Sequence, residues 1–330
     1  MRKIFPFCLL LLFIALGCDN QEENLDPDRS EDQLTFKNDK ILKSKIEVNL
    51  KNDFQKGKKF SNTDLTDQVA QINQQLKTYG IQLEKMEYLS ADGAGQTVFF
   101  NNRGNKQLSS QFVPNDPRNL VPGTDIYYIV DGTQLTTSSG FNILESTINV
   151  MNTWGNVTCS DELNLPLGGI SDDDIGFVSN VFFGFGGSAG FFPGVIVHAG
   201  ILPKAFFDAL APDGGTGIIG VTFTFTWTED INEDGIGDVA IKEIYYNDYF
   251  NFQDLEVTDE GIDYETVSLH EVGHALNQAH FGKLSRTESN QKFHFSPRAL
   301  MNAGYTGVNR VVEKTDNAGH CSIWDAWPAE

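Results

Sequence analysis

The stretch HEVGHALNQAH, residues 270–280, contains three histidines whose spacing constrains how the chain must fold around them. His270 and His274 are four residues apart, so on an α-helix they lie on one face and can bind one metal ion together. His280 comes six residues later, and a continuous helix would point it roughly 120° away from the other two. The helix must therefore end between residues 274 and 280 if the three side chains are to converge.

Asn277 stands where that break is needed. A sharp helix end requires a residue that accepts left-handed backbone angles, and asparagine is the most tolerant residue after glycine. We expect Asn277 to be the hinge that turns His280 back toward the other two histidines.

Three neutral imidazoles leave one tetrahedral position open, which is typical of a catalytic zinc site. Glu271 follows the first ligand and should point toward the open position, where it can act as a general base. The alternative is a helix with ordinary core histidines. With six histidines in 330 residues, a chance triple at this spacing is improbable. His294 and His320 are expected to be surface or core residues.

His270, Glu271, His274 and His280 resemble the zinc motif HExxHxxGxxH of the metzincins, with Asn277 in place of the glycine. That family also has a methionine turn, and SPRALMNAGY resembles it at Met301.

Within the metzincins the sequence is most similar to the matrixins, over about residues 122–328. SLHEVGHAL resembles their active-site helix, TDNAGHCSIWDAW their C-terminal helix and VIVHAG their edge strand above the cleft. The resemblance implies that Tyr305, Val197, His198 and Ala199 line a substrate pocket. It also implies that a peptide pairs with the strand at residues 195–200.

Two departures from the matrixins concern metal binding and latency. Of the histidines that hold a structural zinc in matrixins, only His198 is present, so a second zinc is not expected. No cysteine lies between Cys18 and residue 120, which excludes latency by a cysteine switch. Asp116 could reach the metal instead, although Asp-Pro is also a common turn.

The N-terminus predicts export. Residues 1–17 have two basic residues followed by an apolar run, as in a secretory signal peptide, and IALGC resembles a bacterial lipobox that would place a lipid on Cys18. The alternative is an ordinary signal with a chance cysteine. Residues 18–34 are acidic and suit a solvated tether. We therefore expect an extracytoplasmic protein that is anchored to the membrane of the cell envelope by lipid.

Composition limits the partners and the redox state. Acidic residues number 45 against 24 basic ones, for a net charge of −21, so nucleic acid is not an expected partner. Cys159 and Cys321 remain after export and should form a disulfide in an oxidising compartment. The alternative is two buried free thiols.

The pattern of apolar residues predicts an α+β fold. Residues 35–120 form a small α/β segment, with a helix over 61–80 and strands over 81–89 and 95–102. This segment is a candidate propeptide, and we place a domain boundary near residue 120. Residues 121–330 should form the metallopeptidase domain, with a twisted mixed sheet. Its expected strands are 125–130, 174–185, 194–202, 220–227 and 241–246, and its expected helices are 140–157 and 263–276.

A second metal site is suggested by DINEDGIGD, which places Asp230, Asn232, Asp234 and Asp238 at the spacing of a calcium loop. The twelfth position is Ile241 instead of the usual glutamate, so an acidic turn between two strands is an equal alternative.

Together these features predict a zinc endopeptidase that acts on protein or peptide substrates, with Ca²⁺ as a second candidate ion. Two other functions stay open. One is a zinc-containing lipoprotein that binds at the surface without catalysis, and the other is hydrolysis of a non-peptide amide.

Overall fold

A computed structural model of the chain describes residues 39–50, 62–100, 108–289 and 292–329. The expected signal peptide, Cys18 and the acidic tether lie outside the described residues. Within the part that the structure describes, no helix combines the length and apolar character needed to cross a membrane.

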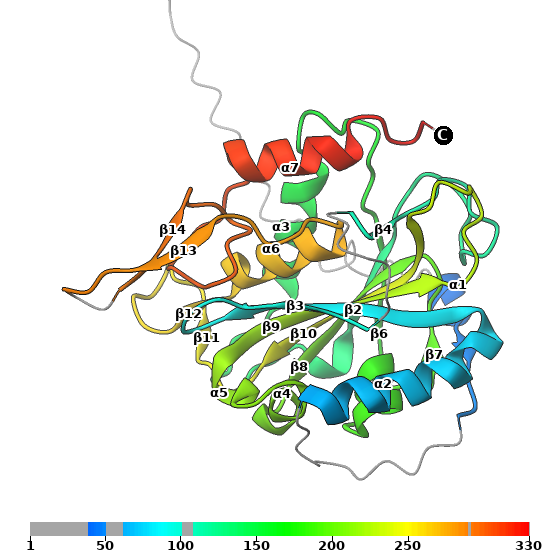
Figure 1. Ribbon diagram of the computed structural model, residues 1–330, viewed down its shortest axis with the longest axis horizontal. Helices are drawn as coiled ribbons and strands as arrows, with labels where there is room; N and C mark the ends of the chain where they lie inside the picture. Colours follow the sequence, from blue (N-terminus) through cyan, green and yellow to red (C-terminus); the bar gives the residue numbers. More distant parts are fainter. Residues whose placement is uncertain (1–38, 51–61, 101–107, 290–291, 330) are drawn as a thin grey trace, which may run out of the picture. The chain divides into compact units, whose positions relative to one another are not determined.

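One twisted, mixed sheet organises the fold (Figure 1). Its strands follow the order β3-β2-β9-β10-β8-β5-β6, with β4 paired to β10 off this path. Strands β10, β8, β5 and β6 run parallel, whereas β9 is antiparallel to β10, and β2 is antiparallel to β9 and β3. The bounds are β2 Ile81–Ser90, β3 Thr97–Phe99, β4 Ser110–Gln111, β5 Tyr128–Asp131, β6 Leu167–Ser171, β8 Val195–Leu202, β9 Ile218–Trp227 and β10 Gly237–Asn247.

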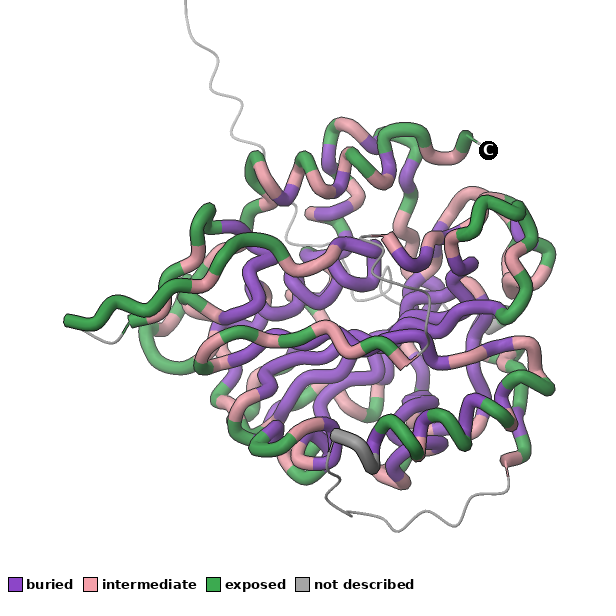
Figure 2. The backbone as a smooth tube through the Cα atoms, in the orientation of Figure 1, coloured by how far each residue is buried: buried purple, intermediate pink, exposed green. Residues whose placement is uncertain are grey.

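Helices cover both faces of the sheet (Figure 1). On one face lie α2 (Asn62–Leu76) and α4 (Lys204–Leu210), and on the other lie α3 (Leu144–Gly155), α6 (Tyr264–Ala275) and α7 (Lys314–Trp324). Each layer has its own apolar cluster, and neighbouring strand residues alternate between them: Val197 belongs to the first and Ile196 to the second. The central strands and α6 are buried nearly throughout (Figure 2).

Short elements complete the described part of the chain. They are α1 Asp39–Leu42, β1 Ile46–Glu47, η2 Lys77–Tyr79, η3 Gly132–Gln134, η4 Ser179–Phe183, β7 Gly190–Phe191, α5 Gly214–Gly217, β11 Phe252–Gln253, β12 Ile262–Asp263, β13 Lys283–Arg286 and β14 Phe293–Ser296.

The α+β class and most expected elements are confirmed. The amphipathic helix before the first strands is α2, and the chain leaves its final turn through Gly80 at a left-handed φ of 76°. The helices expected over 140–157 and 263–276 are α3 and α6.

The strand expected over 174–185 is wrong. This region contains a single turn of π-helix, η4, which ends at Gly184 with a φ of 67°. The N–H groups of Phe177 and Val178, just before the turn, donate to the carboxylate of Glu243 at 2.7 and 2.8 Å. A buried acceptor therefore holds the backbone in a conformation that the apolar pattern could not predict.

The domain boundary expected near residue 120 is also wrong. Residues 36–330 form one compact unit, and strands β2 and β3, which precede residue 120, belong to the same sheet as β9. The residues expected to form the edge strand, 195–200, lie in β8, between β5 and β10. Because β8 is paired with a strand on each side, it is an interior strand and not the expected edge strand.

Candidate metal centre

Helix α6 carries two of the three histidines and is fixed at both ends. At its start, the carboxylate of Asp263 accepts the N–H of Thr266 at 3.0 Å, which is a standard N-cap. Near its middle, the indole of Trp154 on α3 donates to the carbonyl oxygen of Leu269 at 3.0 Å. The helix is thus held in a buried position between α3 and the sheet.

The helix ends in the way that the third histidine requires. Asn277 has a φ of 67°, which confirms the expected hinge. The N–H of Gln278 donates to the carbonyl of Gly273 at 2.9 Å, and Trp324 donates to the carbonyl of Leu276 at 3.0 Å. These bonds satisfy carbonyl groups that a helix end leaves without partners.

The three imidazoles converge. Nε2 of His274 lies 3.1 Å from Nε2 of His270 and 3.1 Å from Nε2 of His280. Within the described ranges, these histidines are the only group of three or more potential ligands whose atoms come together, all within 4.8 Å of one another.

The other ring nitrogens fix the direction in which these rings present their lone pairs. Nδ1 of His270 lies 2.8 Å from the carbonyl of Leu300, and Nδ1 of His274 lies 2.7 Å from that of Gln278. Since a carbonyl only accepts, each Nδ1 carries the proton and each Nε2 presents a lone pair to the centre.

The protonation state of the rings suits a cation. Burial lowers the pKa of His270 to about 4, and burial also lowers the pKa values of His274 and His280. Two neutral rings whose unprotonated nitrogens face each other cannot form a hydrogen bond, because neither nitrogen carries a proton to donate. The 3.1 Å spacing is close to the roughly 3.3 Å expected for tetrahedral ligands around zinc at Zn–N distances of about 2.0–2.1 Å. The residues therefore fit a zinc ion.

Met301 packs against α6 in the turn between His270 and His274. A β-carbon added at Gly273 would meet the sulfur of Met301, so the side chain reaches the helix backbone. The carboxylate of Asp316 accepts the N–H groups of Leu300 and Met301 at 2.8 and 3.0 Å. The carbonyl of Met301 accepts the N–H of Phe281, the residue after the third histidine, at 2.7 Å.

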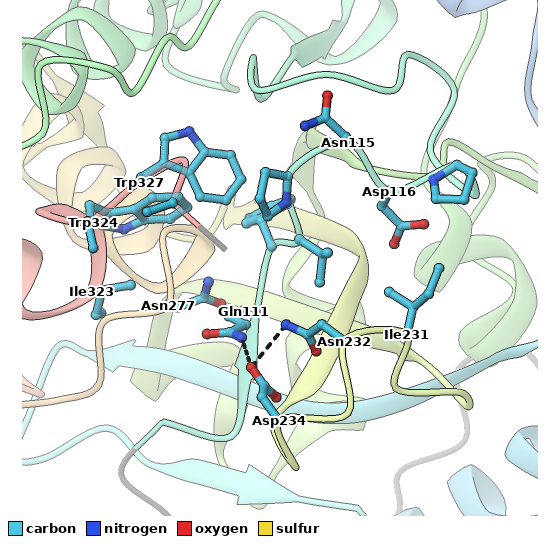
Figure 3. A pocket seen from close by; sticks show the side chains of 16 residues that line it. Gln111, Asn115, Asp116, Ile231, Asn232, Asp234, Asn277, Ile323, Trp324 and Trp327 are labelled. Carbon is cyan, nitrogen blue, oxygen red and sulfur yellow. Dashed lines mark hydrogen bonds between the residues drawn. The ribbon is translucent and has the colours of Figure 1, made fainter.

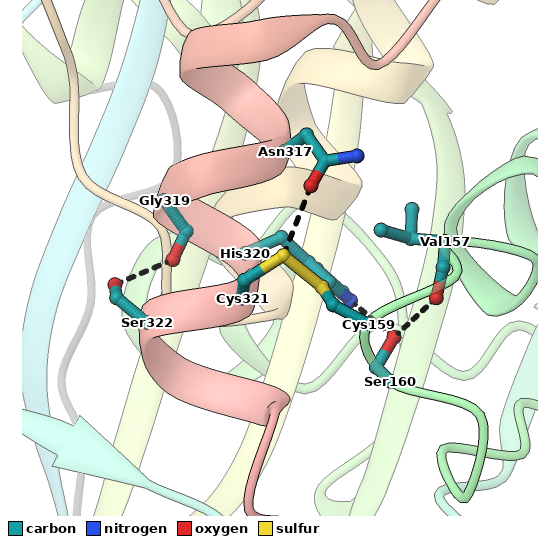
Figure 4. Close-up of a disulfide and its surroundings, with 8 residues drawn as sticks. All are labelled: Val157, Cys159, Ser160, Asn317, Gly319, His320, Cys321 and Ser322. Carbon is teal, nitrogen blue, oxygen red and sulfur yellow. Dashed lines mark hydrogen bonds between the residues drawn. A yellow bond between two sulfur atoms is a disulfide. The ribbon is translucent and has the colours of Figure 1, made fainter.

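A disulfide holds α7, the helix that supplies Asp316 (Figure 4). Cys321 on α7 is bonded to Cys159, in the segment after α3. Beside it, Nε2 of His320 lies 2.9 Å from the hydroxyl of Ser160, and the ring stacks on Trp154 at 5.2 Å. His320 is thus a buried structural residue, and His294 is an exposed residue of β14.

Glu271 is buried between α6 and the sheet. Its Oε2 accepts the hydroxyl of Thr222 on β9 at 2.7 Å, and its Oε1 accepts the backbone N–H of Leu89 on β2 at 3.3 Å. Burial raises the pKa of Glu271 to about 8, and the charge of Glu87 adds to this, whereas the two hydrogen bonds oppose it. A cation at the histidines would lower that pKa and favour the ionised base.

Strand β2 contributes a second buried carboxylate that the sequence did not single out. Oε1 of Glu87 lies 3.7 Å from Nδ1 of His274, and Oε2 of Glu87 lies 2.8 Å from Nζ of Lys85. Charged residues at alternate positions of an otherwise apolar strand were the available signal, because such groups are buried only when they are paired.

The expected substrate pocket is only partly in place. Val197, His198 and Ala199 are fully buried in the interior strand β8, so the prediction that they contact substrate is wrong. Burial lowers the pKa of His198 to about 3. Tyr305 lies beside the end of β2, where its N–H donates to the carbonyl of Ser90 at 2.9 Å, and its hydroxyl accepts the N–H of Asp263 at 3.0 Å.

The acidic loop does not bring its oxygens together as a ligand set. The carboxylate of Asp238 is bound to Arg118, and Asp234 accepts the side-chain amides of Gln111 and Asn232 (Figure 3). The loop therefore matches the acidic-turn alternative.

Asp116 does not reach the histidines. Its carboxylate is paired with Arg118 at 2.6 Å, and Arg118 also binds Asp238. The suggestion that Asp116 is a metal ligand is therefore wrong.

Two pockets include the hinge residue Asn277 in their lining. One of about 240 Å³ includes His280, Met301 and Asp316 in its lining. A larger one, about 710 Å³, lies between the end of α7 and the loops around residues 115 and 232 (Figure 3). No histidine ligand lines the larger pocket, so we do not place chemistry there.

Neither a search against protein-family models nor a search of curated proteins finds a match for this sequence. The assignment of a function therefore depends on the geometry of the site.

Proposed function

We propose that the chain is a zinc-dependent endopeptidase with a metzincin-like catalytic domain. The observation that carries the proposal is the convergence of three imidazole nitrogens, two of them from the helix that also carries the buried Glu271. His270, His274 and His280 would hold the metal, and Met301 packs against the helix that carries two of them. A zinc ion with three histidine ligands supplies a Lewis acid that polarises a carbonyl group and makes water reactive near neutral pH.

Glu271 is the proposed general base. It would take a proton from the attacking water and deliver it to the amine that leaves when the peptide bond breaks. One of its present hydrogen bonds must be exchanged for this, and the hydroxyl of Thr222 can rotate away from Oε2 without moving the backbone. The other hydrogen bond, from the N–H of Leu89 to Oε1 of Glu271, comes from the backbone of strand β2.

Attachment of a lipid at Cys18 and location in the cell envelope remain part of the proposal. The Cys159–Cys321 disulfide supports an oxidising compartment. A peptide or protein substrate is part of the proposal because the motif from His270 to His280 resembles that of zinc peptidases.

The rival function is a zinc-containing lipoprotein that binds without catalysis. One observation favours it: both oxygens of Glu271 already have partners within the chain. An ordinary structural carboxylate would be satisfied in this way.

The test compares cleavage of unfolded casein by the wild type and by Glu271→Ala, with and without a zinc chelator. Glu162→Ala, a change at an exposed position in the loop after α3, serves as the matched control. We expect chelator-sensitive cleavage by wild type and control, and a loss of about 100-fold or more in Glu271→Ala while its zinc content is unchanged. Equal cleavage by Glu271→Ala would contradict the proposal. Absence of cleavage in every form, including after limited proteolysis of the N-terminal segment, would favour the binding protein.

A further inference from the structure

Strand β2 covers the edge of β9 that faces away from the rest of the sheet. The two strands pair antiparallel from Ile81 opposite Trp227 to Ser90 opposite Ile218. The other edge of β9 is paired with β10. Without β2, the backbone groups of β9 would be free to bind an extended peptide by strand addition.

The carboxyl end of β2 is held from a second side as well. The N–H of Ser90 donates to the carbonyl of Ala303 at 3.3 Å, and its carbonyl accepts the N–H of Tyr305 at 2.9 Å. This contact with the segment after Met301 is parallel, through the bridge between Ser90 and Gly304. The end of β2 therefore lies between β9 and the chain that follows the methionine turn.

The base of the site contacts the backbone of β2. Oε1 of Glu271 accepts the N–H of Leu89 at 3.3 Å, and this N–H belongs to the peptide bond between Tyr88 and Leu89. Opposite Leu89 on β9 is Gly220. A β-carbon at Gly220 would meet Cγ and Oε1 of Glu271, so the glycine makes room for the carboxylate. The backbone amide that contacts the carboxylate of Glu271 therefore belongs to the chain itself.

The side chains of β2 close the site further. Leu89 is buried on the α6 face in the same apolar cluster as Val267 and Leu300, against which Tyr305 packs. Glu87 is buried beside His274. The strand is thus seated by backbone bonds, by an apolar anchor and by a charged group next to the histidines.

We propose that β2 is a built-in occupant of the position where a peptide substrate would bind, and that the chain is latent while β2 is seated. This inference rests on the proposed endopeptidase function. Because β2 is covalently attached, its effective concentration at the site is on the order of millimolar or higher, and an added peptide competes poorly with it. Activation then requires that β2 leave the edge of β9.

The first arm of the test locks β2 in place. Gln82 and Thr226 face each other across the two strands, far along β2 from Glu271. Opposed β-carbons lie about 4.5–5.5 Å apart, near the range that a disulfide spans. The double variant Gln82→Cys/Thr226→Cys is oxidised, loaded with zinc and given a quenched fluorescent peptide with the sequence of residues 84–93. We expect at least a tenfold loss of turnover relative to wild type, restored by a reductant. Wild type and the two single-cysteine variants are oxidised and reduced in the same way. They show how much of any change in turnover comes from the native Cys159–Cys321 disulfide.

The second arm unseats the strand. Leu89→Asp places a charge in the apolar cluster, so turnover of the same peptide should rise about tenfold over wild type. If the locked protein is as active as wild type and Leu89→Asp is no more active, β2 is a permanent part of the enzyme and the latency is overturned.

A binding measurement separates this inference from the proposed activity. In a Glu271→Gln background, the labelled peptide should bind Leu89→Asp protein at least tenfold more tightly than the locked protein. If this binding difference is found but no protein that retains Glu271 cleaves the peptide, the result would support β2 as the occupant of the peptide position and would overturn the proposed endopeptidase activity. Neither binding nor turnover in any form would overturn both.

Discussion

The side chain of Met301 lies against the backbone of Gly273, in the turn of α6 between His270 and His274. A β-carbon on residue 273 would collide with the sulfur of Met301 and would lie 3.0 Å from its terminal methyl group. Glycine at this position therefore sets how closely the methionine turn approaches the helix that carries the ligands.

Gly273→Ala should lower both stability and metal affinity. The added methyl group must displace Met301 or the helix, which we expect to cost about 1–3 kcal/mol of unfolding free energy. Chemical denaturation and zinc titration measure the two effects. Gly217→Ala is the matched control, because a β-carbon there meets nothing within 4 Å. Equal effects of the two substitutions would show that the contact with Met301 is unimportant.

Asn277→Gly should keep the fold and the metal, whereas Asn277→Val should lose both in part. Residue 277 has a φ of 67°, which glycine adopts freely and a β-branched residue adopts only with strain of about 1–3 kcal/mol. Zinc affinity and the melting temperature of the two variants check this prediction. A valine variant that binds zinc as tightly as wild type would mean that the hinge does not position His280.

The sequence predicted the local part of the site because helix geometry is local. The spacing of His270 and His274 implies a shared face, and the position of His280 implies a break, for which Asn277 was the suitable residue. The structure shows that break at that residue.

The arrangement of strands could not be predicted in the same way, since pairing depends on contacts between residues distant in sequence. Leu89 and Glu271 are 182 positions apart, and no local pattern links them. Residues 195–200 looked like an edge strand, yet an apolar run of that length equally fits an interior strand such as β8. Glu243, which accepts the N–H groups of Phe177 and Val178 just before the turn at Ser179–Phe183, is likewise more than 60 positions away from them in sequence.

Replacement of both cysteines of the Cys159–Cys321 disulfide by serine should destabilise the protein. The bond joins residues 162 positions apart, so the chain-entropy model gives a loss of up to about 5 kcal/mol. Because α7 carries Asp316, the methionine turn should also loosen and zinc affinity should fall. Denaturation of the double variant and its zinc titration measure these effects. An unchanged zinc affinity would show that Asp316 holds the turn without help from the disulfide.

Glu243→Gln should change how stability depends on pH. Burial raises the pKa of Glu243 to about 7 from 4.5, so folding favours its protonated form. Its contribution to stability is complete below about pH 4.5 and is lost as the pH rises through 7. Since glutamine does not titrate, the free energy of unfolding of the variant should rise relative to that of the wild type over this pH range, by on the order of 3 kcal/mol. Denaturation between pH 4.5 and 8 measures the difference. A constant difference, equal to that of the exposed control Glu162→Gln, would contradict the prediction.

The affinity of the protein for zinc tests the metal centre most directly. It is measured by competition with a chromophoric chelator in the wild type and in three single variants, His270→Ala, His274→Ala and His280→Ala. We predict about one zinc per wild-type chain and a loss of at least 100-fold in affinity for each variant, while the exposed control His294→Ala binds like wild type. A wild-type chain that binds no zinc, or a His280→Ala variant that binds it as tightly as wild type, would contradict the account.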